Sequence, residues 1–462
     1  MNALTLRGDR FLTRHFTRPS ITWQQSMLIV LPLIAEHLFQ SLFGLLNTAM
    51  ISSSGVTSLS AVSLVDSLNT FLFVFYSGIA TGASVLVANC RGAGDRDKLH
   101  EASCQAVTTV TLFTLITTLF IVLFNQPLLN ALFGSAEQEI IEKARLYMLG
   151  GALTLPLVGF CTAICGVLRG IGEGKTSLLY TLISSAAYVS MNVLFLTVLD
   201  WGIPGLILSV SLSRLCNVPL LLLLKHFRKS AFRFRIRELL RVNWNMFRNI
   251  TKVGIPCALE QLFFSGGRVV IQAIIVPLGT EAIVTYNVAY SLMIFNQVLN
   301  TPISSAMFPI VGICMGNNRP QDARELTNTY VIFSTLVYVV AGGLIMLFFE
   351  PLAGLYHPPA ELLPDIRLCV LITAIAHPLL HTPAFMLASV FRAAGDVNYT
   401  TVISLVSMWL CRVLGAYVLG ITLEMGILGV WIAMLADWLL RAVLFPIRFR
   451  GKKWLRHKLI IK

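Results

Sequence analysis

Two stretches of the sequence decide the fold: LPLIAEHLFQSLFGLLNTAMISSSG at residues 31–55 and IPCALEQLFFSGGRVVIQAIIVPLG at residues 255–279. They align without a gap in the register that pairs Glu36 with Glu260. The same register gives 16 identities over the 61 positions from residue 32 to residue 92. An apolar chain produces chance matches among Leu, Val and Ile, but it does not align Pro, Glu, Gly and Cys in one register. The sequence therefore contains an internal repeat that relates its two halves.

The composition is that of a membrane protein. The 462 residues are 56% hydrophobic and 12% charged, and their mean hydropathy is +0.76. Soluble globular chains are about one quarter charged, so an ordinary soluble enzyme, a disordered chain and a disulfide scaffold are excluded. A helical span needs about 20 apolar residues. Twelve segments of about that length are present: residues 24–50, 59–88, 103–124, 144–168, 177–199, 204–224, 250–276, 282–315, 327–349, 366–391, 400–419 and 426–447.

The two copies have the same orientation, because six spans per copy is an even number. Two later motifs repeat as well. Gly202-Ile-x-Gly205 matches Gly426-Ile-x-Gly429 in the original register, and Arg169-x-x-Gly172 matches Arg392-x-x-Gly395 one position away from it. We expect an all-α polytopic membrane protein of twelve transmembrane helices, in two parallel six-helix repeats around a central cavity. The expected parts are a cytoplasmic N-terminus (1–23), an N-lobe (24–224), a basic cytoplasmic linker (225–249), a C-lobe (250–447) and a basic cytoplasmic tail (448–462).

The distribution of positive charge along the sequence predicts how the chain is oriented in the membrane. The formal net charge is +13, and Lys and Arg fall on alternate connections, with Lys143, Arg145 and Arg367 as exceptions. By the positive-inside rule both termini and the linker are cytoplasmic, in a plasma membrane that we expect to be a bacterial inner membrane. The six Arg and two Lys of residues 225–249 are expected to meet anionic lipid headgroups. No nucleic-acid partner is expected.

The sequence resembles the multidrug and toxic compound extrusion (MATE) family over residues 24–447. Motifs at matching positions of the repeat carry the resemblance: Leu31-Pro32, GIPCALEQL (254–262), PLGTEAI (277–283), LRGIGEGKT (168–176), FRAAGDVNYT (391–400) and the glycine loops at 91–95 and 315–319. The resemblance implies export of small organic molecules in exchange for H⁺ or Na⁺. Many members carry an aspartate late in the first span, where this chain has Asn47 in Leu-Asn47-Thr. Asparagine cannot titrate, so the coupling role of that aspartate does not carry over.

Three acidic residues are candidates for cation coupling. Glu36 and Glu260 each follow a proline by four residues, and a helical rise of about 1.5 Å per residue places both near the middle of the bilayer. Burial favours the protonated form of a carboxyl group, which suits a proton-coupled site. The alternative is a structural carboxyl that bonds backbone groups freed by the proline. Asp66, inside the second span, is either a cavity-lining cation site or a paired acid.

The remaining polar residues of the spans suggest a substrate cavity. We place Asn47, Arg268, His377, His381 and Tyr290 in it. The two histidines are spaced i,i+4 and suit a proton relay, or they satisfy carbonyls freed by Pro378 between them. Aromatic residues at helical spacing form either a drug-binding wall or ordinary packing.

Arginines inside the spans leave two interpretations open. Arg268, Arg214 and Arg412 either neutralise intramembrane acids or bind an anionic or phosphate-bearing substrate. Asp437 and Arg441, spaced i,i+4, are expected to form a structural ion pair.

The sequence therefore predicts a secondary active exporter that works by alternating access of two lobes. The first alternative is a flippase for a lipid-linked or polyanionic precursor. The lesser alternative is a major-facilitator transporter, whose loop after the second span this chain matches poorly at RGAGDRDK (91–98). An enzyme is not expected, since no nucleophile–base set is apparent. We expect no metal or organic cofactor, H⁺ or Na⁺ as the coupling ion, and a monomer.

Overall fold

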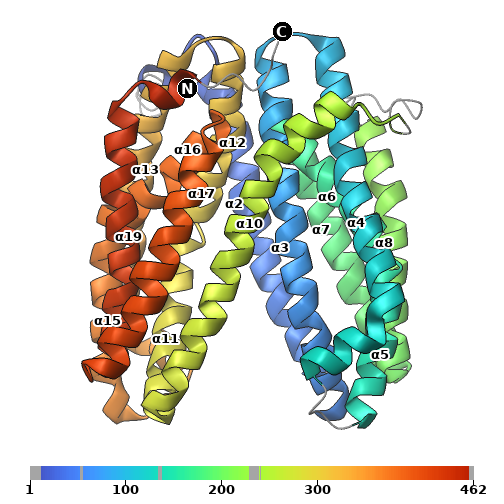
Figure 1. Cartoon of the computed structure of the whole chain (residues 1–462), viewed down its shortest axis with the longest axis vertical. Helices are drawn as coiled ribbons and strands as arrows, with labels where there is room; N and C mark the ends of the chain where they lie inside the picture. The colour runs from blue at the N-terminus through green and yellow to red at the C-terminus, as the bar shows by residue number, and fades with distance from the viewer. Residues whose placement is uncertain (1–11, 53–55, 134–137, 228–238, 240, 457–462) are drawn as a thin grey trace, which may run out of the picture. The chain divides into compact units, whose positions relative to one another are not determined.

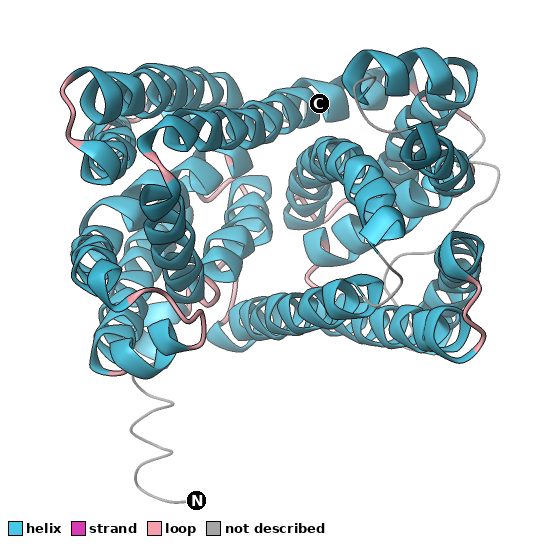
Figure 2. Ribbon diagram, turned by 90° about the horizontal axis from the view of Figure 1, so that it is seen from below, coloured by secondary structure: helices cyan, strands magenta, loops and turns pink. Residues whose placement is uncertain are grey.

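The computed structural model describes residues 12–52, 56–133, 138–227, 239 and 241–456, and nearly all of them are helical (Figure 1). Figure 2 shows helices joined by loops and no strand in this part of the chain. The only β-type pairing among the described residues is a bridge between Arg18 and Ile21. The predicted all-α class is confirmed.

Besides the helical residues 12–16, the first half of the chain has seven α-helices and one π-helix with described bounds. They are α2 (Trp23–Ser52), α3 (Val56–Gly92), α4 (Arg96–Phe133), α5 (Gln138–Ala152), α6 (Leu155–Gly170), α7 (Gly174–Asn192), η1 (Val193–Val198) and α8 (Gly202–Phe227).

The second half has more and shorter elements. They are α10 (Trp244–Ile275), η2 (Val276–Leu278), α11 (Thr280–Gln297), α12 (Asn300–Gly316), α13 (Pro320–Leu347), α14 (Phe349–Gly354), η3 (Ala360–Leu362), α15 (Leu363–Ala376), η4 (His377–Met386), α16 (Leu387–Ala393), α17 (Val397–Val406), η5 (Ser407–Leu414), α18 (Gly415–Tyr417), η6 (Val418–Thr422), α19 (Gly426–Arg450) and η7 (Lys453–Arg456).

The described helices give ten segments long and apolar enough to cross a membrane, or twelve if each of two bent pairs is one span. The pairs are α5 with α6, bent by 48°, and α11 with α12, bent by 44°. Pro156 and Pro302 stand in the first turns of α6 and α12, where a proline has no intrahelical N–H bond to lose. Each proline therefore begins a new helix, and the predicted fourth and eighth spans are broken rather than continuous.

Four described segments are π-helical, with i→i+5 bonds in place of i→i+4 bonds. One of them, η1, ends the fifth span. The longest, η4, lies in the tenth span, and η5 and η6 lie in the eleventh. Helices of this kind are often found at functional sites, and two predicted site residues, His377 and His381, lie in η4.

The chain divides into two compact units. Unit 1 comprises residues 1–30, 92–94 and 259–462, and unit 2 comprises residues 31–91 and 95–258. The boundaries pass through α2 and α10, the first helix of each repeat. Each of these helices thus begins in one unit and continues in the other, whereas the sequence placed the whole of each helix in one lobe.

Unit 2 has an apolar core between α3, α4, α5 and α8. The buried side chains of this core include Val65, Tyr76, Ile121, Tyr147 and Leu206. Within the same unit, α3 approaches the first half of α10 very closely: a Cβ atom at Gly82 would lie 2.5 Å from the Gly254 Cα. Small residues at both positions allow this close approach.

Unit 1 has an aromatic core between α11, α15 and α19. Its buried members include Tyr286, Trp431 and Trp438. The Trp431 indole N–H donates to the Cys369 carbonyl at 3.0 Å, so this large ring is buried without losing its hydrogen bond.

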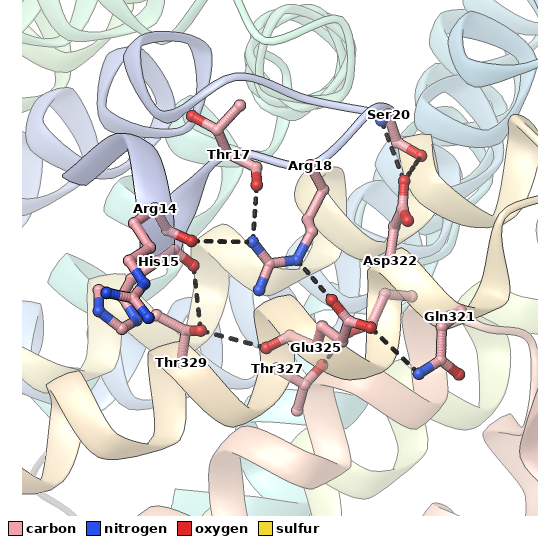
Figure 3. A network of polar contacts seen from close by, with 11 residues as sticks. Arg14, His15, Thr17, Arg18, Ser20, Gln321, Asp322, Glu325, Thr327 and Thr329 are labelled. Carbon is pink, nitrogen blue, oxygen red and sulfur yellow. Dashed lines mark hydrogen bonds and ion pairs between the residues drawn. The ribbon is translucent and has the colours of Figure 1, made fainter. Parts of the chain in front are cut away.

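The segment that precedes α2 is bound to α13 by a polar network (Figure 3). The Arg18 guanidinium lies 2.7 Å from the Glu325 carboxylate, and the Ser20 hydroxyl donates to Asp322 at 2.5 Å. The ring of Phe16 packs edge-on against Tyr330, with 5.3 Å between centroids. Polar and apolar contacts together fix this segment within unit 1.

The predicted basic linker is only partly within the described residues, since 228–238 and 240 lie outside them. Its described end is bound to α4 in unit 2. Gln105 donates to the Arg241 carbonyl at 2.6 Å, and the Phe247 ring stacks on Phe113 with 6.1 Å between centroids.

Candidate functional site

Glu36 lies buried in unit 2 among hydroxyl groups. It is on α2, one turn after Pro32, and is 3% exposed. The Thr181 hydroxyl donates to its Oε1 at 3.1 Å, and the Ser177 hydroxyl lies 3.5 Å from its Oε2. Both hydroxyls come from α7. No ion pair to Glu36 occurs among the described residues, and both hydrogen-bond partners of this carboxylate there are hydroxyl groups.

Glu260 lies in unit 1 beside a cation. It is on α10 and is 7% exposed, and its Oε1 is 2.5 Å from Nη2 of Arg392 at the end of α16. Its Oε2 has no hydrogen-bond partner among the described residues. Sequence reasoning placed Arg392 in a cytoplasmic loop and missed this partner. The signal for it was the match of Arg169-x-x-Gly172 with Arg392-x-x-Gly395.

Asp66 accepts two neutral hydrogen bonds. The Tyr147 hydroxyl on α5 donates to its Oδ1 at 3.2 Å, and the Asn69 amide donates to the same atom at 3.3 Å. The side chain is half-buried. As with Glu36, the described residues include no ion pair to Asp66.

Arg214 of α8 stabilises the break between α5 and α6. Its Nη1 donates to the Gly151 carbonyl at 2.9 Å and to the Thr154 hydroxyl at 2.6 Å. The Thr118 hydroxyl of α4 donates to the Ala152 carbonyl at 3.0 Å. Carbonyl groups without an intrahelical partner are costly inside a membrane. Arg214 therefore stabilises this bend, and the two roles that the sequence left open for it, neutralising an acid or binding an anionic substrate, stay predictions.

His377 and His381 are buried inside unit 1, with His377 0% and His381 8% exposed. Asn296 Nδ2 lies 2.8 Å from His377 Nδ1, and the Tyr338 hydroxyl lies 2.9 Å from His381 Nδ1. Both rings also stack against neighbours, His377 on Trp438 at 5.2 Å between centroids. In this structure the two histidines are packed into the helix bundle, and their place in a substrate cavity stays a prediction.

Arg268 and Tyr290 lie together at the exposed side of unit 1. Arg268 Nη1 is 3.3 Å from the Tyr290 hydroxyl, and the Arg268 side chain is exposed. The Tyr290 ring stacks on Tyr286, one turn earlier in α11, with 5.5 Å between centroids. Of the predicted cavity residues, the structure thus brings these two into contact.

Asp437 and Arg441 lie side by side on α19, with Arg441 Nη2 2.8 Å from Asp437 Oδ1. A third charged residue, Arg412 of η5, lies 3.9 Å from Asp437 Oδ2. The sequence predicted the pair of Asp437 and Arg441 but not its contact with Arg412. The spacing i,i+4 identifies partners on one helix, but it contains no information about a cation on the neighbouring helix.

Asn47 belongs to α2, but its side chain lies outside the described residues. Among the residues that are described, no group of three or more His, Cys, Asp and Glu side chains could hold a metal ion.

Comparison with known proteins identifies the family. The model of the MatE family matches residues 32–194 and 256–418, once in each half of the chain and in the register that pairs Glu36 with Glu260. The chain belongs to this family. The predicted resemblance to the MATE transporters is thus confirmed, and so is the two-fold repeat.

Similar proteins match along almost the whole chain. The "Probable multidrug resistance protein NorM" of Thermotoga maritima is 25% identical over 445 residues, which cover 94% of this chain and 93% of that protein. The "Uncharacterized transporter YisQ" of Bacillus subtilis is 22% identical over 445 residues, covering 96% of this chain and 95% of that protein.

Solved structures share the fold of this MATE chain. "Crystal structure of MATE in the bent conformation" matches with a TM-score of 0.84 at 18% identity, covering 92% of this chain and 94% of the other. "Outward-facing conformation of a multidrug resistance MATE family transporter of the MOP superfamily" matches with a TM-score of 0.83 at 18% identity, covering 98% and 99%.

Family membership settles three predictions. The protein is a multi-pass membrane transporter, as expected from its composition and its repeats. It is a transporter and not an enzyme, because MATE proteins move molecules across membranes. The alternative of a major-facilitator transporter is wrong, because both halves match the MatE model.

Proposed function

We propose that this MATE protein exports small organic molecules in exchange for H⁺ or Na⁺, by alternating access of its two lobes. Relatives named as probable multidrug resistance proteins support the substrate class. The charge pattern of the connections supports a plasma-membrane orientation with both termini and the linker in the cytoplasm. The basic linker then faces the anionic headgroups of the inner leaflet.

The environment of Glu36 is the observation that carries this proposal. A buried carboxylate with two hydroxyl oxygens resembles the oxygen-rich sites that bind hard cations. Each hydroxyl can turn its lone pairs toward a bound ion, because a hydroxyl both donates and accepts. If the carboxyl group is protonated instead, one of these hydroxyls can accept a hydrogen bond from its O–H.

Glu260 is less suited to the coupling ion in the arrangement seen here. Its Oε1 already faces the positive guanidinium of Arg392 at 2.5 Å, and that charge repels a second cation. We therefore assign the coupling ion to Glu36 and propose that the Glu260–Arg392 pair holds helices α10 and α16 together in unit 1. Asp66 is a second cation candidate in unit 2, held by neutral donors.

The test is transport in proteoliposomes under an imposed pH or Na⁺ gradient, with ethidium as a reporter substrate. Wild type should move ethidium only when one of the two gradients is present. Glu36→Gln should abolish the gradient dependence, since the amide has no charge to titrate or to bind Na⁺. Glu260→Gln is the matched change at the equivalent position. The folded fraction of this variant should still transport ethidium only when a gradient is present. Unchanged ion dependence in Glu36→Gln would show that the coupling site lies elsewhere.

A second candidate function is a flippase for a lipid-linked or polyanionic precursor. The arginines of unit 1 favour it, because Arg268 is exposed and Arg412 is paired only at 3.9 Å. In the same proteoliposomes, translocation of a fluorescent polyprenyl phosphate without any ion-driven movement of a soluble compound would replace the exporter proposal with this one.

A further inference from the structure

Unit 1 contains a buried cluster with more positive than negative charge. Its charged members are Asp437, Arg441 and Arg412, which are 0%, 1% and 3% exposed. Arg441 is fully engaged: it pairs with Asp437, its Nε donates to the Ser407 hydroxyl at 2.7 Å, and its Nη2 donates to the Ser404 carbonyl at 3.2 Å. One carboxylate therefore serves two guanidinium groups, and Arg441 has the closer contact.

Arg412 is the cation left incompletely paired. Its distance of 3.9 Å to Asp437 is too long for a hydrogen bond, and its Nε has no hydrogen-bond partner among the described residues. Its guanidinium lies over the face of Phe264, 5.5 Å from the ring centroid. A buried charge is costly unless it is paired and hydrogen-bonded. An arginine held in this way is prepared for an additional negative charge.

Arg268 extends this positive charge to the exposed side of the unit. It lies on α10 one turn after Phe264, the residue that Arg412 covers. Tyr290 stacks on Tyr286 of the same helix and contacts Arg268 through its hydroxyl at 3.3 Å. No ion pair to Arg268 occurs within the part of the chain that the structure describes.

The close approach of η5 to α10 makes this arrangement possible. Gly267 of α10 has no side chain, and a Cβ atom there would collide with the Met408 side chain of η5. Arg412 follows Met408 by four residues, so the same contact brings Arg412 next to α10. The site therefore combines residues of α10, α11 and η5, all within unit 1.

We propose that Arg268, Tyr290, Tyr286 and Arg412 form the binding site for the anionic group of an aromatic substrate, a carboxylate, sulfonate or phosphate. Arg268 and the Tyr290 hydroxyl contact the anion, because a guanidinium presents two parallel N–H donors to such a group. Arg412 lies behind them and adds positive charge in a poorly solvated environment, where charge acts more strongly than in water. The inference rests on the proposed function, because it adds aromatic anions to the small organic molecules that the exporter moves.

The test compares 2-naphthoate with its uncharged isostere 2-naphthamide, using isothermal titration of the purified full-length protein. Naphthoate should bind at least tenfold more tightly than naphthamide. Arg268→Gln should reduce that preference about tenfold, and Arg268→Lys should retain part of it because the charge remains. Tyr290→Phe should weaken naphthoate binding more mildly. Arg324→Gln is the matched control, since Arg324 lies in the same unit and contacts only the Arg450 carbonyl and the Phe449 ring among the described residues.

Three results would overturn the anion site. One is equal affinity for naphthoate and naphthamide. Another is unchanged naphthoate preference in Arg268→Gln when its thermal midpoint matches that of wild type. The third is that farnesyl phosphate displaces naphthoate but no soluble aromatic anion does. This result would mean that the site binds the anionic headgroup of a lipid.

The outcome also separates this inference from the proposed function. Arginine-dependent naphthoate binding without any gradient-driven transport would retain the site and reject the exporter. Gradient-driven ethidium export with no naphthoate binding or transport would retain the exporter and reject the anion site.

Discussion

The two halves of this MATE chain share the same series of spans, but charged residues of one half match uncharged residues of the other. In the register that pairs Glu36 with Glu260, Asp66 of the first half corresponds to Tyr290 of the second, and Gly44 corresponds to Arg268. The matched glutamates differ as well: Glu36 faces two hydroxyls, whereas Glu260 faces the guanidinium of Arg392. The first half thus offers uncompensated acids and the second offers excess arginine. The two copies therefore share their helices, but the side chains that contact the matched glutamates differ.

The partner of Arg169 sharpens this contrast. Arg169 corresponds to Arg392 in the repeated Arg-x-x-Gly motif, yet its Nε donates to the Cys165 carbonyl of its own helix at 3.2 Å. No ion pair between Arg169 and Glu36 occurs in the described ranges. The same two residue types are therefore an ion pair in one half and separate in the other.

The largest expected effect is the loss of the Glu260–Arg392 pair. Glu260→Gln leaves a buried guanidinium without its counter-charge, which we expect to cost about 3 kcal/mol of stability. Glu36→Gln should cost about 1 kcal/mol or less, because its amide oxygen can accept the same hydroxyl donors. The thermal midpoint of the purified protein in detergent measures both. The double variant Glu260→Gln/Arg392→Gln should recover most of the loss, and equal shifts for the two single variants would remove the proposed distinction.

A smaller loss is expected from Arg214→Leu. This change leaves the Gly151 carbonyl at the α5–α6 bend without its donor, which should cost about 2 kcal/mol. Arg268→Leu is the comparison in the other half and should change the thermal midpoint little, because that side chain is exposed. If Arg268→Leu proves the more destabilising of the two, the assignment of a structural arginine to one half and a binding arginine to the other is wrong.

A milder functional effect is expected from Thr181→Val. The valine keeps the shape of threonine but removes the hydroxyl that donates to Glu36, so apparent affinity for the coupling ion should fall roughly three- to tenfold. The dependence of the ethidium export rate on ion concentration measures this apparent affinity. Thr117→Val provides the control, since that hydroxyl donates to the Phe113 carbonyl. Equal effects of the two variants would indicate a general response of the bundle.

The smallest effect is expected at the surface of unit 1. Arg18→Ala removes a partly exposed ion pair with Glu325 and should cost about 0.5 kcal/mol. Lys143→Ala, which removes the exposed pair with Glu139 in unit 2, should cost no more. A loss from Arg18→Ala as large as that from Glu260→Gln would mean that the N-terminal segment, rather than the buried pair, stabilises unit 1.

The sequence was sufficient for the all-helical class, the order of the apolar segments and the repeat, because a bilayer requires helices that are long and apolar. It did not reveal the bends at Ala152 and Gln297, since hydropathy does not report whether i→i+4 bonding is continuous. Nor did it pair Glu260 with Arg392, because that contact joins helices 132 residues apart. The i,i+4 spacing of His377 and His381 suggested a relay, but it did not predict the rings of Tyr338 on α13 and Trp438 on α19 that pack against them.

The π-helical turn at η5 has a consequence for how the copies diverged. The stretch from Arg392 to Gly426 in the second copy is one residue longer than the matching stretch from Arg169 to Gly202 in the first. An inserted residue in an α-helix is accommodated as a π-turn, and each residue advances the helix by about 100°. In this interval the second copy has η5 and η6, against η1 in the first. Arg412 lies within η5, so the part of the second copy that is one residue longer is also the part that contains this arginine.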